Sequence, residues 1–141
     1  MSDSRFTQWA AQFAVASELC KRRYEVAFTL GHNAPLADIM AISPETHTQF
    51  LIDVKGLAAK NYWQITRKAP RDNLFYLLVL VPREGANTLF IMPQVKVNEG
   101  ITAEFGRLKP SRQQLGERAN RLGLRWRDAE DYVNCWDLLP K

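Results

Sequence analysis

The chain has 141 residues, of which 46% are hydrophobic, 24% are charged and 11% are aromatic. This composition is that of a globular protein and excludes a disordered or fibrous one, and the length is typical of one domain. We therefore predict a single domain over residues 1–141. The net charge of +4 is mildly basic, which favours polyanionic partners without requiring them.

The cysteines and the apolar runs bear on the compartment in which the protein works. Cys20 and Cys135 are far apart and match no metal-ligand spacing, so we expect two free thiols in a reducing compartment. No apolar run approaches the roughly 18 residues of a membrane span. The N-terminus lacks the basic and then apolar order of a signal peptide. These features predict a cytoplasmic protein with no membrane partner.

The first predicted element is a helix over Ser4–Arg23. Three aromatic residues share one face of this helix: Phe6, Trp9 and Phe13. Glu18 falls off this stripe, on a flank that it shares with Ala11 and Ala14. Small residues on that flank would let the helix approach another layer closely. Taken alone, Glu18 is typical of a solvated helix glutamate, because glutamate is mostly exposed.

Six further stretches have the composition of β-strands. They are residues 24–30, 37–42, 49–56, 62–66, 74–81 and 88–92. The fifth is nearly all apolar and ends at Pro82, which predicts a central strand buried on both faces. Residues 31–35 join glycine, asparagine and proline, and therefore predict a loop between the first two strands.

Three charged residues stand in the otherwise apolar strands of one predicted hairpin: Asp38, Asp53 and Lys55. Side chains alternate along a strand, so Asp53 and Lys55 point the same way. A short turn at 43–45 makes the strands pair antiparallel and brings Asp38 close to them. Charges on a half-buried sheet face are costly unless they have partners or a metal. This predicts a functional cluster, with a structural Asp53–Lys55 salt bridge as the alternative.

Two basic segments are candidate contacts for a phosphate backbone. The first is the loop that carries Arg67, Lys68 and Arg71, for which a solvated turn is equally plausible. The second spans residues 107–127, with seven basic residues and one acid, a local charge of 7 − 1 = +6. Its basic residues are Arg107, Lys109, Arg112, Arg118, Arg121, Arg125 and Arg127. They could follow a phosphate backbone or cover an ordinary solvated helix.

Two helices are predicted near the C-terminus. Ser111 caps the first, which has an apolar face and ends at Gly123. Three residues form that face: Leu115, Ala119 and Leu122. The second begins at Asp128 and runs through Leu139, with aromatic and aliphatic residues that we expect to pack on the sheet.

The order of these elements resembles the PD-(D/E)XK superfamily of restriction-endonuclease-like nucleases, in particular its small Holliday-junction-resolvase-like members. The resemblance covers roughly residues 6–92 and implies an α/β (α+β) fold with a central mixed β-sheet flanked by helices. In this pattern Asp38 matches the first acidic position, preceded by Ala37 instead of the proline of the family name, which is often absent. Asp53 and Lys55 match the second acid and the lysine, and Glu18 matches the helix acid of many members.

The resemblance implies a metal-dependent endonuclease that acts on DNA, with branched or damaged DNA among the expected substrates. Its expected catalytic residues are Asp38, Asp53, Lys55 and Glu18. Asp38, Asp53, the Val54 carbonyl and Glu18 are the expected ligands of Mg²⁺ or Mn²⁺, and hard oxygen ligands suit these ions. The expected nucleic-acid contacts are Arg67, Lys68, Arg71, Lys109, Arg112, Arg118 and Arg121. Related enzymes work as symmetric dimers, so a homodimer is expected.

Two other readings stay open at this point. One is a nuclease-like fold that only binds nucleic acid or a protein partner. The other is a subunit of a larger restriction, defence or repair assembly, whose target another subunit selects. The small size supports the second reading, because little chain remains beyond the core to read a base sequence.

Overall fold

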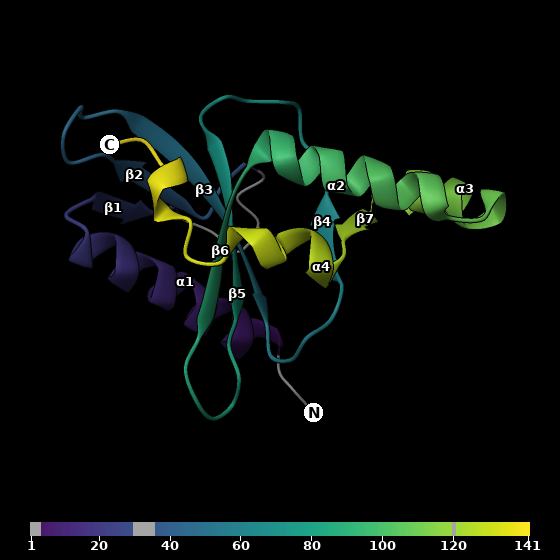
Figure 1. Ribbon diagram of the computed structural model, residues 1–141, viewed down its shortest axis with the longest axis horizontal. Coiled ribbons are helices and arrows are strands. Elements are labelled where there is room, and N and C mark those ends of the chain that lie inside the picture. Colours follow the sequence, from purple (N-terminus) through teal and green to yellow (C-terminus); the bar gives the residue numbers. More distant parts are fainter. Residues whose placement is uncertain (1–3, 30–35, 120) are drawn as a thin grey trace.

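The computed structural model (Figure 1) describes residues 4–29, 36–119 and 121–141, and within them every side chain except those of 115–122. The predicted loop at 31–35 and the end of the first predicted strand at Leu30 lie outside the described residues. None of the described helices has the length and apolar character that a bilayer crossing requires.

A five-stranded mixed sheet forms the centre of the molecule. Its strands lie in the order β1-β2-β3-β5-β6. Their bounds are Glu25–Phe28 for β1, Ile39–Ile42 for β2, Gln49–Leu57 for β3, Leu74–Leu80 for β5 and Thr88–Pro93 for β6. Neighbours are antiparallel except β3 and β5, which are parallel. With helices on both sides, this sheet confirms the predicted class, a central mixed sheet flanked by helices.

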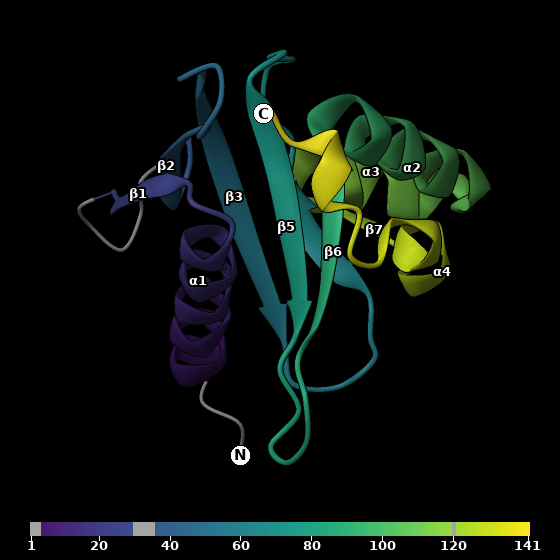
Figure 2. The same cartoon turned by 60° about the vertical axis from the view of Figure 1, so that its left-hand side comes forward.

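Helices cover the two faces of the sheet unequally (Figure 2). Helix α1 (Ser4–Lys21) packs against one face, and α2 (Gln94–Arg107), α3 (Pro110–Ala119) and α4 (Trp126–Ala129) lie on the other side. In Figure 1, α2 and α3 extend away from the sheet. The sequence analysis does not predict α2, because it buries only Gln94, Val97 and Ile101.

The flank of α1 that carries small side chains is the one that meets the sheet. Ala11, Val15 and Leu19 are fully buried against β3 and its neighbours. A Cβ atom on Gly56 of β3 would lie 2.9 Å from both the Ala11 Cβ and the Thr7 carbonyl oxygen. Glycine at this position therefore allows the helix to approach the strand. The aromatic stripe of α1 lies outside the buried face of the helix and is exposed, and Phe13 meets Phe28 of β1 edge-on.

A second, two-stranded sheet includes residues that the sequence predicts to end a helix. Strand β4 (Trp63–Thr66) pairs antiparallel with β7 (Arg121–Leu124), where the sequence predicts a helix continuing through Leu122. The pairing places buried Leu124 opposite buried Trp63. A Cβ on Gly123 would lie 2.5 Å from the Trp63 carbonyl oxygen, so this glycine serves a close strand contact and does not end a helix.

The C-terminal segment is also not the continuous helix that the sequence predicts from Asp128. It consists of α4 and two short 3₁₀ turns, Glu130–Tyr132 and Trp136–Leu138. Between them the chain pairs with the edge of β6: Val133 bridges Phe90, and the Asn134 N–H donates to the Leu89 carbonyl at 2.9 Å. Pairing with the sheet edge interrupts the helix. Of the residues expected to pack on the sheet, Leu139 is buried and Trp136 packs against the core, whereas Val133 and Leu138 are exposed.

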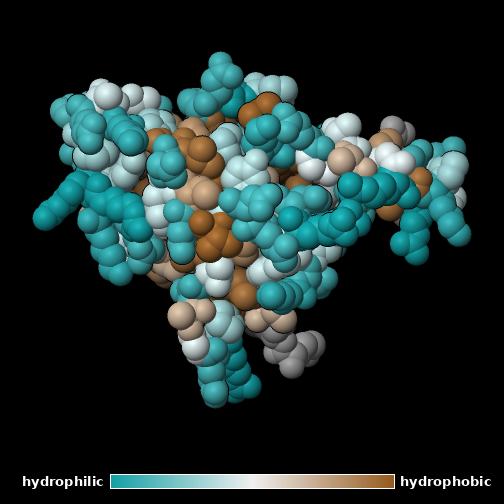
Figure 3. Space-filling model, in the orientation of Figure 1, coloured by the Kyte–Doolittle hydropathy of each residue, from teal (hydrophilic) through white to brown (hydrophobic). Residues whose placement is uncertain are grey.

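The hydrophobic core has two parts, one on each face of the sheet. Strands β3 and β5 contribute to both, because their alternate side chains face opposite ways. Strand β5 is buried over almost its whole length, which confirms the central strand predicted there. On the face in Figure 3, separate hydrophobic areas near the centre are surrounded by hydrophilic surface.

Candidate active site

Asp53 is the most deeply buried carboxylate of the described residues, with 3% of its side chain exposed. It lies in the middle of β3, on the face opposite α1, beside Tyr76 of β5 in the parallel register. Its neighbours Ile52 and Val54 face the other way, into the core under α1. Alternation along a well-anchored strand thus fixes where the Asp53 carboxylate points.

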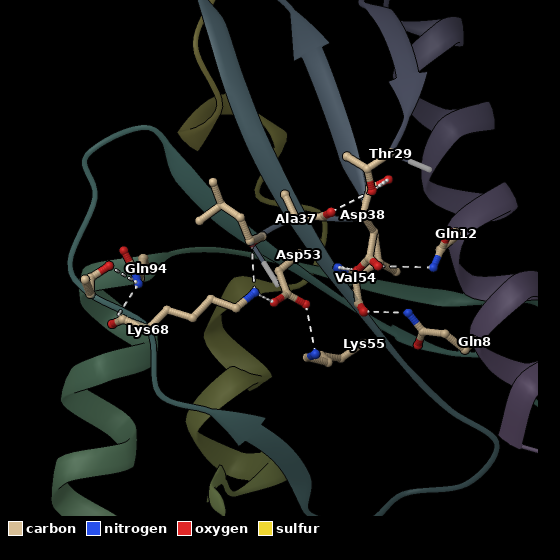
Figure 4. A network of polar contacts seen from close by, with 12 residues as sticks. Gln8, Gln12, Thr29, Ala37, Asp38, Asp53, Val54, Lys55, Lys68 and Gln94 are labelled. Atoms are coloured by element: carbon tan, nitrogen blue, oxygen red, sulfur yellow. Dashed lines mark hydrogen bonds and ion pairs between the residues drawn. The ribbon is translucent and has the colours of Figure 1, made fainter. Parts of the chain in front are cut away.

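Two lysines neutralise this carboxylate from different elements (Figure 4). Lys55, two residues along β3, places its Nζ 3.0 Å from Asp53 Oδ1 and remains 33% exposed. Lys68, from the segment between β4 and β5, pairs with Asp53 Oδ2 and is 16% exposed. The Lys68 ammonium also donates to the Leu36 carbonyl at 2.8 Å and lies over the Tyr76 ring. Lys55 is therefore the cation that reaches solvent, and Lys68 the one fixed in the interior.

Tyr76 forms an apolar and aromatic wall beside this pair. Burial raises the pKa of its hydroxyl, and the nearby Asp53 charge raises it further. The phenol therefore stays protonated across the physiological range, and Tyr76 contributes a ring face to Lys68.

Asp38 lies directly before β2, next to the point on β3 that carries Asp53. Its backbone N–H donates to the Ile52 carbonyl at 2.9 Å, and its carboxylate accepts the Val54 N–H at 2.8 Å. Burial raises the pKa of Asp38, and the Asp53 charge raises it further, against the lowering effects of the Val54 N–H and the two lysines. Asp38 and Asp53 are therefore electrostatically coupled across one peptide of β3.

Two glutamines of α1 complete the site on its other side. Gln12 Nε2 donates to Asp38 Oδ1 at 3.3 Å. Gln8 holds the strand itself: its Nε2 donates to the Val54 carbonyl at 2.7 Å, and its Oε1 accepts the Gly56 N–H at 3.0 Å. Figure 4 shows these glutamines on the α1 side and the lysines on the opposite side of Val54.

Gln94, buried at the start of α2, fixes the segment that delivers Lys68. Its Nε2 donates to the Ala69 carbonyl at 3.1 Å, and its Oε1 accepts the Arg71 N–H at 2.6 Å. The Lys68 carbonyl accepts a longer bond of 3.4 Å from the same Nε2. The Gln94 side chain thus supplies hydrogen bonds to backbone groups of residues 68–71, which belong to no strand.

The structure does not bring Glu18 to this site. Glu18 pairs with Lys21 at 2.9 Å and Arg22 at 2.6 Å on the surface of α1, and these hydrogen bonds lower the pKa of its carboxyl, that from Arg22 most. It lies six residues beyond Gln12, about 9 Å further along the helix axis. The position of α1 that meets Asp38 holds Gln12, so the helix acid expected from the resemblance is replaced by an amide.

The predicted nucleic-acid contacts divide into separate groups. Arg67 lies over the Phe105 ring at 5.9 Å and Arg71 is exposed, both beside Lys68. Lys109 and Arg112 are exposed at the start of α3. Arg118 belongs to α3 and Arg121 to β7, and their side chains lie outside the described part of the structure. Among the predicted contacts whose side chains are described, Lys68 is the one that enters the charged cluster itself.

The oxygen donors around Val54 fit a hard divalent cation. They are the carboxylates of Asp38 and Asp53 and the Val54 carbonyl, and the buried Asp53 Oδ1 accepts no hydrogen bond although Lys55 is near it. No cluster of three or more His, Cys, Asp or Glu side chains occurs among the described residues. Mg²⁺ does not need one, because it usually binds one or two carboxylates and keeps several waters.

Some of these residues had a sequence signal and others had none. Gln8 and Gln12 stand four apart, so they share one face of α1, and this face adjoins the buried residues Val15 and Leu19. Lys68 was predicted to contact nucleic acid, and its place beside Asp53 depends on the path between β4 and β5. Gln94 falls in a helix that the sequence analysis does not predict.

Comparison of the chain with family models, with curated proteins and with solved structures gives no significant match. The PD-(D/E)XK resemblance therefore rests on the residues and on the element order. Function is therefore inferred from the geometry of the charged cluster.

Proposed function

We propose that the protein is a metal-dependent endonuclease whose active site is centred on Asp53. The observation that carries this proposal is the convergence of two carboxylates and two ammonium groups on one buried peptide of β3. Removing such charges from water is expensive, and an apolar core of similar volume is often at least as stable. A cluster of this kind is a candidate for chemistry, because perturbed, buried charges gather at functional sites.

The residues present divide the work of phosphodiester hydrolysis between them. Asp38, Asp53 and the Val54 carbonyl would hold the cation. When bound, Mg²⁺ would supply Lewis-acid stabilisation of phosphate charge and a lower pKa for a coordinated water. Lys55 is exposed enough for its ammonium to donate to a substrate oxygen or to orient the attacking water. Gln8 and Gln12 hold the strand and the Asp38 carboxylate in place.

Charge balance in the cluster determines how Lys68 enters this scheme. With both carboxylates ionised, the two acids and two lysines sum to zero, so a divalent cation adds a net positive charge that attracts phosphate. Lys68 already neutralises Asp53 and therefore competes with the cation for the same carboxylate. We propose that Lys68 sets the affinity of the site for metal.

The proposed substrate is DNA, and a homodimer is the proposed assembly. Sedimentation at micromolar concentration tests the assembly, and a monomer there would contradict it.

A binding-only role is the second candidate. The neutralisation of Asp53 by two lysines favours it, because a purely structural ion-pair cluster has the same balance. In that case the protein binds nucleic acid or a protein partner through the same fold and does not cleave.

The test is cleavage by the pure protein of supercoiled, linear, single-stranded and four-way-junction DNA and of RNA, with Mg²⁺, Mn²⁺ or EDTA. Lys55→Met is the site variant and Lys96→Met the matched control, because Lys96 pairs with Glu99 on the surface of α2. The nuclease proposal predicts cleavage that requires metal and Lys55 and is insensitive to Lys96. If the protein binds these substrates but cleaves none of them, the second candidate is supported instead.

A further inference from the structure

Four aromatic rings form an exposed patch along α1 and β1, which we call the aromatic patch: Phe6, Trp9, Phe13 and Phe28. Their exposed fractions lie between 42% and 71%. The rings of Trp9 and Phe13 are stacked, with centroids 6.0 Å apart and planes at 26°. Phe13 meets Phe28 edge-on at 5.6 Å. Trp9, Phe13 and Phe28 therefore form one connected set of rings, and Phe6 stands three residues before Trp9 on the same helix.

The sheet does not need these rings for its own packing. The residues of α1 that enter the core are smaller, with Ala11, Val15 and Leu19 fully buried. The larger apolar side chains of the helix face solvent instead. Exposed apolar surface of this kind, gathered in one place, marks an interaction site.

The aromatic patch adjoins the candidate active site. Gln12 precedes Phe13 in the chain and donates to the Asp38 carboxylate. Thr29 follows Phe28, and its backbone N–H donates to the Asp38 carbonyl at 2.9 Å. Figure 4 shows Gln12 and Thr29 next to Asp38. A ligand that reaches Asp38 from the α1–β1 side would therefore meet these rings.

The helix residues along the patch favour a polyanion, and the Asp38 carboxylate at its edge is a proposed metal ligand. Residues 4–17 of α1 contain no aspartate or glutamate, and Glu18 is the first acid of the helix. The guanidinium of Arg5 lies 5.8 Å from the Phe6 ring centroid, at one end of the patch. On β1 the only acid, Glu25, lies at the opposite end of the strand from Phe28.

We infer that the aromatic patch binds unpaired nucleobases of a DNA strand next to the phosphate at the active site. This inference rests on the proposed nuclease function and names its substrate class: single strands, or duplexes whose strands are separated at the cleavage point. Flat rings with exposed faces stack bases of any sequence, and arginine beside them contacts the backbone. Bases that stay paired within a duplex cannot stack on these rings.

The test measures binding separately from cleavage. Fluorescein-labelled oligothymidylate and a duplex of the same length are titrated in EDTA, and fluorescence anisotropy gives both dissociation constants. The variants are Trp9→Ala, the conservative Trp9→Phe, Phe13→Ala and the control Val95→Ala, whose side chain is as exposed as that of Phe13, at 59%. Circular dichroism checks that each variant is folded.

The expected result is tighter binding of the single strand than of the duplex by the wild-type protein. Trp9→Ala and Phe13→Ala should each weaken single-strand binding by about 5- to 150-fold, the usual range for loss of one base-stacking ring. Trp9→Phe should retain most of the affinity, and Val95→Ala all of it. Duplex binding should change by less than about twofold in every variant.

Three results would overturn the inference. The first is single-strand affinity that stays within about twofold of wild type in both alanine variants. The second is a wild-type protein that binds the single strand no better than the duplex. The third is unchanged DNA binding with conversion of a dimer to a monomer in sedimentation, which would make the patch a subunit interface. Failure of the nuclease proposal looks different: base stacking as predicted, without cleavage under any metal condition.

Discussion

Glu18 and Asp53 each pair with two cations, and the contrast between them separates a candidate site from a group of surface ion pairs. Glu18 pairs with Lys21 and Arg22 within one turn of α1, and 27% of its side chain is exposed. Asp53 has 3% exposed, and its cations come from β3 and from the segment before β5. Residue types alone do not distinguish the two groups. The two groups differ in the burial of the carboxylate and in whether its cations come from separate elements of the fold.

The largest expected difference between the two groups is in stability. Asp53→Ala leaves Lys68 in the interior, and Lys55 near the surface, without their carboxylate, and should lower the free energy of unfolding by about 3–5 kcal/mol. Glu18→Ala breaks exposed pairs that solvent already screens, and should cost at most about 1 kcal/mol. Urea unfolding followed by circular dichroism measures both. Equal losses would show that the Asp53 cluster is energetically a surface feature.

The next effect concerns the competition between Lys68 and metal. Lys68→Met removes a positive charge from the Asp53 carboxylate, so the Mg²⁺ concentration for half-maximal thermal stabilisation should fall roughly tenfold. Without Mg²⁺ the same variant should melt below wild type, because Asp53 loses a partner. Thermal melts over a range of Mg²⁺ concentrations measure both effects, with Lys96→Met as the control. An unchanged or weaker Mg²⁺ response would contradict the role given to Lys68.

Removal of the Asp38 charge should increase stability, whereas removal of Asp53 should lower it. Its pKa in the folded protein is raised above the ordinary value of 3.8, chiefly by burial, so the charged form is destabilising. Asp38→Asn should therefore increase the free energy of unfolding at pH 7, while cleavage is lost. The gain should shrink as pH falls through the raised pKa and vanish below about 3.8, where Asp38 is protonated folded or unfolded. A gain that does not change with pH would show that another interaction causes it.

The smallest effect belongs to Glu18, whose pKa is lowered by its hydrogen bonds to Arg22 and Lys21. A lowered pKa gives stability that is present above the ordinary value of 4.5 and is lost as pH falls through the folded value. Glu18→Gln should remove at most about 1 kcal/mol at pH 7, and less at high salt. Unfolding at two salt concentrations checks this. A loss that is larger and independent of salt would mean that Glu18 has a structural role that its exposure does not suggest.

How much of the site follows from sequence depends on how local its geometry is. Asp38, Asp53 and Lys55 lie on one hairpin, so strand alternation and a short turn suffice to bring them together. Lys68 comes from a crossover between parallel strands, whose path the sequence pattern does not fix. Its partner Gln94 belongs to α2, which has too few buried apolar residues to give a clear helical period.

The first helix shows why a correct element can still yield a wrong site residue. Its length, its register of aromatics and its small-residue flank are all visible in the sequence. The position of that flank along β3 depends on the close contact of Gly56 with Thr7 and Ala11, which are distant in sequence. In this position Gln8 lies beside Val54 and Gln12 beside Asp38, whereas Glu18 lies further along the helix. The C-terminal helices are predicted only in part for a similar reason: α3 forms where a helix is expected, but pairing with β4 and β6 overrides the local preference beyond it.

The most direct test of the central claim compares the two carboxylates in single-turnover cleavage with Mg²⁺. Asp53→Asn and Glu18→Gln are each neutral, isosteric replacements, and both proteins are first checked by circular dichroism. The account predicts that Asp53→Asn abolishes cleavage of the preferred substrate and that Glu18→Gln cleaves at the wild-type rate. Cleavage by pure Asp53→Asn at the wild-type rate would contradict the assignment of this cluster as the active site.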